Sequence, residues 1–177
     1  MKLKFLLIID AQNDFISGAL GSPEAQKARD KICDIIKNGD YTNIFLSYDT
    51  HKDDEYLNTR EGRYLPIKHC IVGTDGMEFD SKIKETISKI NVATHYIMKN
   101  TFGSLMWNVM FPVHMEDIEV DVVGFCTDIC VISNALIIKA MYPETEINVI
   151  ADGCAGSSPA AHEAALTVMK SCQIEVR

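Results

Sequence analysis

Short apolar segments alternate with segments of helical periodicity along most of the chain. Five apolar segments are rich in β-branched residues and short enough to be single strands: residues 3–9, 44–48, 95–98, 120–123 and 147–150. Continuous apolar runs of this length are typical of parallel strands that are buried on both faces. Residues 173–176 predict one more strand at the end of the chain.

Helical patterns lie between these runs. Ile32, Ile35 and Ile36 follow Pro23 at a spacing that places them on one helical face, and a second such series follows Asp80. The alternation of strand and helix predicts a three-layer α/β/α fold with a mostly parallel sheet of five to six strands, Rossmann-like in its arrangement. No repeat, linker or low-complexity tract divides residues 1–177, so we predict a single domain.

Composition mainly excludes classes of partner. Apolar residues make up 47% of the 177 residues and charged residues 24%, which is ordinary for a globular domain with one large core. The net charge of −8, without clustered Lys and Arg, argues against a nucleic-acid surface. No apolar run approaches the roughly 20 residues of a membrane span, and the first ends too early for a signal peptide. We therefore expect a cytoplasmic protein whose six cysteines are thiols.

Chemically reactive side chains gather where the predicted strands end. Asp10 follows the first strand, Asp49 and His51 follow the second, Lys99 follows the third, and residues 126–130 follow the fourth. In an open parallel sheet, ligands bind beyond the carboxyl ends of the strands. We therefore expect these residues to face one crevice.

Cys130 lies where the fourth strand gives way, through a short polar turn, to a helical pattern over residues 131–141. Backbone N–H groups at a helix N-terminus favour a thiolate and can hold an oxyanion, although many free cysteines are simply buried. Outside the loop that follows residue 49, no histidine stands at a strand end to act as its base, whereas Asp10 does. Burial would raise the pKa of the Asp10 carboxyl, and Lys99 would oppose that shift.

Asp10, Lys99 and Cys130 therefore form a candidate catalytic set. Taken singly, Asp10 is equally compatible with a turn cap and Lys99 with a solvated strand end. Their joint placement beside Cys130 favours a site.

Residues 50–76 show no clear periodicity, and so long a loop in a compact domain is usually functional. Asp49 and His51 stand at its start, and Glu61 and His69 lie within it. Two imidazoles with carboxylates suit zinc, iron or manganese and leave positions for water or substrate. The alternative is a polar loop whose charges are merely solvated.

Five motifs occur in order along the chain: IDAQNDF at 9–15, DTH at 49–51, LPIKHCIVGT at 65–74, KNTFGS at 99–104 and GFCTDICV at 124–131. Together they resemble the motifs of the isochorismatase-like cysteine hydrolases, and within them the nicotinamidase group. The resemblance spans nearly the whole chain. It implies an amidohydrolase that acts on a small amide, with nicotinamide as the first choice and another small amide or an N-carbamoyl compound as the alternative.

The resemblance also implies roles for single residues. Asp10, Lys99 and Cys130 would be catalytic, and the backbone amides of Cys126 and Cys130 would form the oxyanion hole. A cis peptide bond is expected between Cys126 and Thr127. The candidate substrate walls are Phe15, Leu65 and Phe102.

For the cofactor, the resemblance implies one divalent metal, Zn, Fe or Mn, with four ligands: Asp49, His51, His69 and Glu61. Lys68 lengthens the spacing between Glu61 and His69, so Glu55 or water is an alternative to Glu61. The expected partners are a small-molecule amide and further copies of the chain in a homo-oligomer. A non-catalytic binding protein that keeps the same fold is the alternative from a different class.

Overall fold

The computed structural model describes residues 3–111 and 114–177. In these ranges six strands, all parallel, form one sheet in the order β3-β2-β1-β4-β5-β6. The strands are β1 (Leu3–Ile9), β2 (Asn43–Asp49), β3 (Ala93–Lys99), β4 (Ile118–Phe125), β5 (Glu146–Ala155) and β6 (Glu175–Val176). The predicted strands are all present, which confirms the α/β fold with a parallel sheet.

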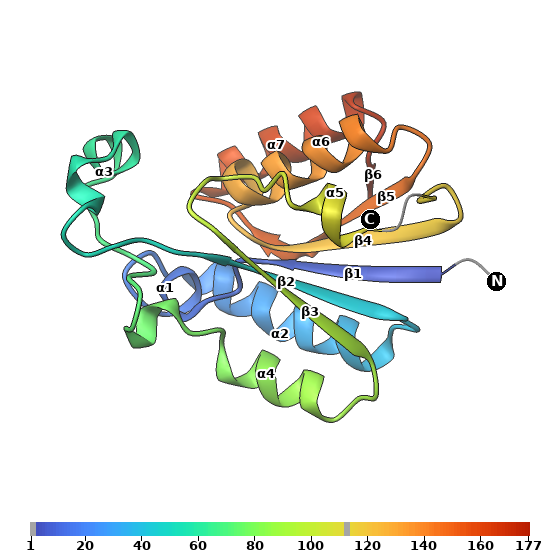
Figure 1. Ribbon diagram of the computed structural model, residues 1–177, viewed down its shortest axis with the longest axis horizontal. Coiled ribbons are helices and arrows are strands. Elements are labelled where there is room, and N and C mark those ends of the chain that lie inside the picture. The colour runs from blue at the N-terminus through green and yellow to red at the C-terminus, as the bar shows by residue number, and fades with distance from the viewer. Residues whose placement is uncertain (1–2, 112–113) are drawn as a thin grey trace.

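Helices cover both faces of this sheet, as Figure 1 shows. One face carries α1 (Asn13–Ile16), α2 (Pro23–Asn38) and α4 (Ser81–Ser88). The other carries α6 (Ile132–Met141), α7 (Pro159–Ser171) and the short α5 (Trp107–Met110). The three-layer arrangement is therefore confirmed.

The two helices predicted from isoleucine spacing are α2 and α4, and each begins at a side-chain cap. Ser22 Oγ accepts a hydrogen bond from the amide of Ala25 at the start of α2. The Asp80 carboxylate accepts hydrogen bonds from the amides of Lys82 and Ile83 at the start of α4. Such caps satisfy N–H groups that have no partner within the helix.

The core is centred on β1, which lies between β2 and β4. Leu6, Leu7, Ile8 and Ile9 of this strand are fully buried. Each buried aliphatic side chain contributes roughly 1.5–3 kcal/mol relative to an exposed one. The carboxyl end of β1, where Asp10 follows, is thus held by a fully buried stretch of the central strand.

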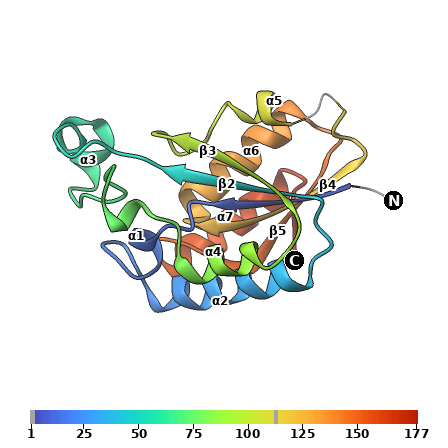
Figure 2. The same cartoon turned by 60° about the horizontal axis from the view of Figure 1, so that its bottom comes forward.

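The long connection between β2 and α4 is not a plain loop. It contains the 3₁₀ helix η1 (Tyr56–Asn58), the helix α3 (Arg60–Tyr64) and the 3₁₀ helix η2 (Asp75–Met77). These helices are too short to show a helical period in the sequence, which is why none was predicted. Figures 1 and 2 both show α3 standing away from the sheet, and we call the segment 50–76 the arm.

In the described part of the chain, no helix is both long and apolar enough to cross a membrane. The six cysteines are all free thiols.

Candidate functional site

The candidate catalytic side chains lie at the carboxyl ends of neighbouring strands. Asp49 and Lys99 are the last residues of β2 and β3 and face each other in register. Asp10 follows β1 directly, and Cys130 lies in the π-helical turn η3 (Thr127–Val131) that follows β4. The crevice expected from the strand ends is therefore formed by these residues.

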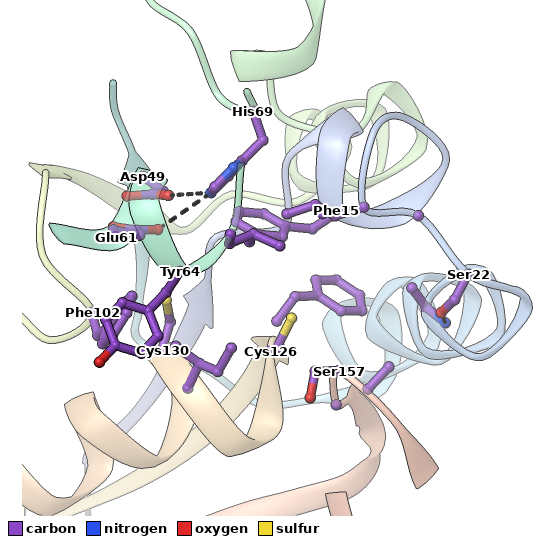
Figure 3. Close-up of a pocket in the computed structure, with 18 of the residues that line it drawn as sticks. Phe15, Ser22, Asp49, Glu61, Tyr64, His69, Phe102, Cys126, Cys130 and Ser157 are labelled. Carbon is purple, nitrogen blue, oxygen red and sulfur yellow. Dashed lines mark hydrogen bonds and ion pairs between the residues drawn. The ribbon is translucent and has the colours of Figure 1, made fainter. Parts of the chain in front are cut away.

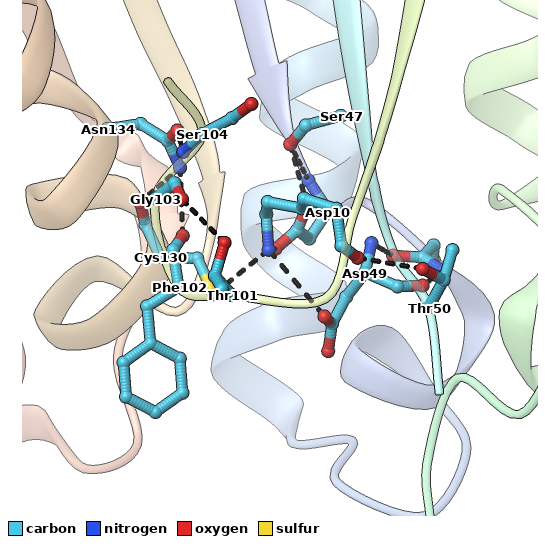
Figure 4. A network of polar contacts seen from close by, with 12 residues as sticks. Asp10, Ser47, Asp49, Thr50, Thr101, Phe102, Gly103, Ser104, Cys130 and Asn134 are labelled. Carbon is cyan, nitrogen blue, oxygen red and sulfur yellow. Dashed lines mark hydrogen bonds and ion pairs between the residues drawn. The ribbon is translucent and has the colours of Figure 1, made fainter. Parts of the chain in front are cut away.

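Asp10, Lys99 and Cys130 meet in a buried contact (Figure 4). The Nζ atom of Lys99 lies 2.6 Å from Oδ2 of Asp10 and 3.6 Å from Sγ of Cys130. Ser47 Oγ donates a 2.6 Å hydrogen bond to the other carboxylate oxygen of Asp10. The lysine is thus placed to act on both the carboxylate and the thiol.

Burial sets the protonation of this group. It raises the pKa of the Asp10 carboxyl, and the Lys99 ammonium opposes that rise, as expected from the sequence. Burial lowers the pKa of Lys99, but the charges of Asp10, Cys130 and Asp49 outweigh it and the net shift is upward. Lys99 is therefore a cation.

Cys130 differs from the sequence expectation. Burial and the nearby Asp10 carboxylate raise the pKa of its thiol well above the ordinary value, so the resting group is a thiol and not a thiolate. The helix α6 begins only at Ile132, after the π-helical turn, so Cys130 does not stand at the start of a regular α-helix. A base is consequently needed to form the nucleophile.

Two polar residues that the sequence interpretation overlooked hold Asp10 and Asp49. Asp10 has a left-handed backbone, with φ of 48°, and its amide donates to the carbonyl oxygen of Ser47 at 3.1 Å. The fully buried Gln12 side chain donates to the carbonyl oxygen of Asp49 at 2.9 Å and accepts from the amide of Asp49 at 2.8 Å. The sequence did contain one indication of this contact, because Ser47 is a lone hydroxyl residue inside an apolar strand run.

The cis peptide bond lies one residue earlier than expected. It joins Phe125 and Cys126, and the predicted cis bond between Cys126 and Thr127 is wrong. The strand β4 extends to Phe125, so the turn that presents the nucleophile begins directly at the strand end. Gly124 precedes it with φ of 125°, and a Cβ atom there would overlap the carbonyl oxygen of Ile9.

Asn134 of α6 is a further residue that the sequence interpretation missed. It is fully buried, and its amide nitrogen donates to the carbonyl oxygens of Cys130 and Phe102 at 2.7 and 3.1 Å. Its side-chain oxygen accepts from the amide of Ser104 at 2.9 Å and from the indole of Trp107 at 2.8 Å. Asn134 therefore ties the nucleophile turn to the segment that follows Lys99.

A four-residue cluster of metal-ligating side chains lies beside this contact: Asp49, His51, Glu61 and His69. One donor atom from each residue lies within 4.8 Å of the others. Nε2 of His51 is 2.9 Å from Asp49 Oδ2 and 3.7 Å from Glu61 Oε1, and Nε2 of His69 is 3.5 and 3.6 Å from the same two oxygens. Glu55 instead pairs with Lys52 at 2.9 Å.

These separations fit a metal ion. Four ligands at about 2.0–2.1 Å around a tetrahedral centre lie roughly 3.3 Å from one another. Hydrogen bonds with His51 and His69 hold the pKa of Asp49 below its usual range despite burial, and Asp49 and Glu61 raise the pKa of His69 to about 10, also against burial. Two imidazoles and two carboxylates in this arrangement suit zinc, iron or manganese.

A cavity of about 940 Å³ opens between the cluster and Cys130 (Figure 3). The three predicted walls, Phe15, Leu65 and Phe102, all line it. The ring of Phe15 also packs edge-on against His69, with centroids 5.5 Å apart. Tyr64 of the arm, which was not predicted as a wall, lines the cavity as well.

Comparison with known proteins agrees with this arrangement. Residues 4–177 match the model of the isochorismatase domain. The chain belongs to the isochorismatase family. The family resemblance stated from the motifs is thereby confirmed.

Within the isochorismatase family, the similar proteins include nicotinamidases and pyrazinamidases. The chain is 28% identical to the nicotinamidase/pyrazinamidase of Mycobacterium tuberculosis over 191 residues, covering 98% of each protein. It is 30% identical to the nicotinamidase PncA of Bacillus subtilis, whose crystal structure superposes with a TM-score of 0.78 over 99% of each chain. The pyrazinamidase of Pyrococcus horikoshii, solved in complex with zinc, has the same fold, with a TM-score of 0.74, 24% identity and 98% coverage of each chain.

Proposed function

We propose that this isochorismatase-family protein is a metal-assisted cysteine amidohydrolase that converts nicotinamide to nicotinate and ammonia through a Cys130 thioester. The observation that carries this proposal is the buried contact among Asp10, Lys99 and Cys130 at the edge of a cavity that also contains a four-donor cluster. The names of the relatives at 28–30% identity support nicotinamide as the substrate.

The first half of the reaction forms the thioester. Asp10 takes the proton of the Cys130 thiol, and the thiolate attacks the amide carbonyl carbon. The backbone amides of Cys126 and Cys130 are the proposed donors to the oxyanion of the tetrahedral intermediate. The carbon–nitrogen bond then breaks, and Asp10 returns the proton to the leaving ammonia.

The second half releases the acid. Asp10 removes a proton from water, and the resulting hydroxide attacks the thioester carbonyl carbon. The carbon–sulfur bond breaks, nicotinate leaves, and the proton returns to the Cys130 sulfur. Throughout, the Lys99 ammonium stabilises whichever of Asp10 and Cys130 carries the negative charge, because its Nζ atom lies near both.

Asp49, His51, Glu61 and His69 are the proposed metal ligands, one more than the three protein ligands typical of catalytic zinc sites. When bound, the metal would supply Lewis acidity to the pyridine nitrogen by accepting one ligand beyond the four from the protein, as catalytic zinc can. The chain itself orients the ring, with Phe15 fixed against His69 and Phe102, Leu65 and Tyr64 lining the cavity. An oriented ring holds the carbonyl carbon near Cys130 and so lowers the entropic cost of attack.

An ammonia-release assay on a panel of amides tests the proposal. We expect nicotinamide to be cleaved with a far higher kcat/KM than a simple aliphatic amide or an N-carbamoyl amino acid. If the N-carbamoyl compound is the preferred substrate, the alternative function within the family holds. Release from none of these compounds, by a folded and metal-loaded protein, would instead indicate a binding protein.

A further inference from the structure

The cavity beside Cys130 is larger than a single-ring amide requires. Its volume of about 940 Å³ is near the upper end of the range of roughly 300–1,000 Å³ found for sites that hold drug-sized ligands. In Figure 3, Cys126 lies between Cys130 on one side and Ser22 and Ser157 on the other. We define the far lobe as the part of the cavity lined by Ser22 and Ser157 and by the lining residues near them in the chain: Leu20, Ala25, Ala155 and Gly156.

The side chains of the far lobe are neutral, and all but Leu20 are small. The charged residues that line the cavity come from the end of β2 and from the arm: Asp49, Arg60, Glu61 and His69. The two helices that start beside the lobe each have a side-chain cap, since Ser22 Oγ accepts from the Ala25 amide at 3.0 Å and Ser158 Oγ accepts from the Ala161 amide at 3.2 Å. A neutral group therefore suits this space better than an anion.

One wall of the far lobe is fixed to the nucleophile turn. The Asp128 carboxylate, two residues before Cys130, accepts hydrogen bonds from the amide of Ser157 at 2.7 Å and from its hydroxyl at 2.6 Å. A Cβ atom on Gly156 would lie only 2.7 Å from Oδ1 of Asp128. These two hydrogen bonds join the Ser157 wall of the lobe to the turn that carries the reacting sulfur.

We propose that the far lobe is a subsite for a neutral, apolar substituent on the substrate ring. The proposal rests on the proposed function, in which the ring nitrogen faces the four-donor cluster and the carboxamide carbon reaches Cys130. Position 5 is the ring atom meta to both the nitrogen and the carboxamide, so a substituent there would extend away from the cluster and from Cys130, and the far lobe is the part of the cavity left to hold it. The substrate class is therefore pyridine-3-carboxamides with an apolar group at position 5, in addition to nicotinamide.

Three compounds test this subsite: nicotinamide, 5-phenylnicotinamide and the anionic 5-carboxynicotinamide. Binding is measured by calorimetry on the Cys130→Ala protein, and kcat/KM on the wild type. We expect the phenyl compound to bind at least about tenfold more tightly than nicotinamide, as burial of an apolar group in a fitting pocket predicts, and to be hydrolysed. The carboxy compound should bind no more tightly than nicotinamide.

A substitution that narrows the lobe provides the second measurement. Leu20→Trp should lower kcat/KM for 5-phenylnicotinamide at least about tenfold more than for nicotinamide. Leu3→Trp, the same change at a half-exposed leucine at the opposite end of β1, should not alter the ratio. If Leu20→Trp does not fold, the binding comparison on Cys130→Ala still decides the question.

Failure of the subsite is distinguishable from failure of the proposed function. If nicotinamide is hydrolysed but the phenyl compound binds no more tightly, or is not hydrolysed, the far lobe is not a subsite and the proposed function stands. If neither amide is hydrolysed, the proposed function fails. If, in addition, 5-phenylnicotinamide binds no more tightly than nicotinamide, or neither compound binds, the subsite is overturned as well.

Discussion

The charge of the Asp10 carboxylate depends on a small number of contacts. It has no exposed surface, and it lies between the Ser47 hydroxyl at 2.6 Å and the Lys99 ammonium at 2.6 Å. Burial alone would favour the neutral acid, which cannot accept a proton. Lys99 is therefore the residue that keeps Asp10 available as a base.

This gives a pH prediction for Lys99→Met. Loss of the cation should raise the pKa of Asp10 further, so the carboxylate that acts as base forms only at higher pH. The acid limb of kcat/KM against pH should consequently move toward higher pH. Because the thiol, carboxyl and ammonium are coupled, the shift belongs to the group as a whole.

The matched control is Lys89→Met, which removes an exposed lysine that pairs with Glu85 at 2.6 Å. Its pH profile should overlay that of the wild type. An unmoved acid limb in Lys99→Met would mean that Lys99 does not act on the base.

At the residue scale, the sequence indicated the side chains that stand directly at strand ends. Asp10 and Lys99 could be predicted because parallel strands bring their carboxyl ends to one edge. Asn134 could not be predicted, because three of its four hydrogen bonds join residues 27 to 32 positions away in the chain. A polar residue in an apolar helix carries no indication of such partners.

The β4–α6 connection is the element whose backbone most directly positions the nucleophile. Gly124 pairs with Ile9 of β1 and adopts a φ of 125°, which side chains rarely tolerate. We predict that Gly124→Ala destabilises the protein by at least about 1–3 kcal/mol, the usual cost of such backbone strain, with an added clash against the Ile9 carbonyl. Urea unfolding measures the loss.

Gly73→Ala is the control for this substitution. Gly73 also has a positive φ, 84°, but no heavy atom beyond its two chain neighbours lies within 4 Å of the position its Cβ would take. It should therefore show the cost of the backbone conformation alone. Equal losses for the two variants would contradict the tight approach of β4 to β1.

The arm carries three of the four proposed metal ligands, so metal binding should be linked to its order. Because a ligand that binds only the folded state raises its stability, zinc should raise Tm and a chelator should lower it. We predict that His69→Ala loses most of this zinc-dependent rise, whereas His114→Ala, at an exposed histidine far from the cluster, keeps it. Calorimetric titration with zinc gives the affinities, and equal affinity for the two variants would exclude the cluster as the site.

At the element scale, the strands could be predicted and the arm could not. Apolar runs identify buried strands such as β1 and β4 because burial on both faces requires them. The helix α3 stands away from the sheet, and all the helices of the arm have only a few residues, so no apolar face repeats often enough to reveal them. The choice of Glu61 over Glu55 in the cluster consequently came from the structure and not from the spacing of these residues in the sequence.

At the scale of the whole molecule, the sheet edge formed by β3 exposes apolar side chains to solvent. Tyr96 and Met98 of the edge strand β3 are 61% and 67% exposed, and no charged side chain of β3 projects into solvent to discourage pairing with another chain. The homo-oligomer expected from the sequence stays a prediction. Light scattering should give a mass of at least twice the 19.8 kDa of one chain. Met98→Lys should lower this mass. A wild-type monomer at micromolar concentration would contradict it.

The central claim for the molecule is that Cys130 is the nucleophile of a nicotinamidase. The most direct measurement is ammonia release from nicotinamide by Cys130→Ala, with Cys33→Ala, at a buried cysteine of α2, as the matched control. The account predicts that Cys130→Ala is folded and at least about a thousandfold slower than the wild type, as loss of a covalent nucleophile requires, whereas Cys33→Ala is nearly as active. A Cys130→Ala protein that keeps a tenth of the wild-type rate would contradict it.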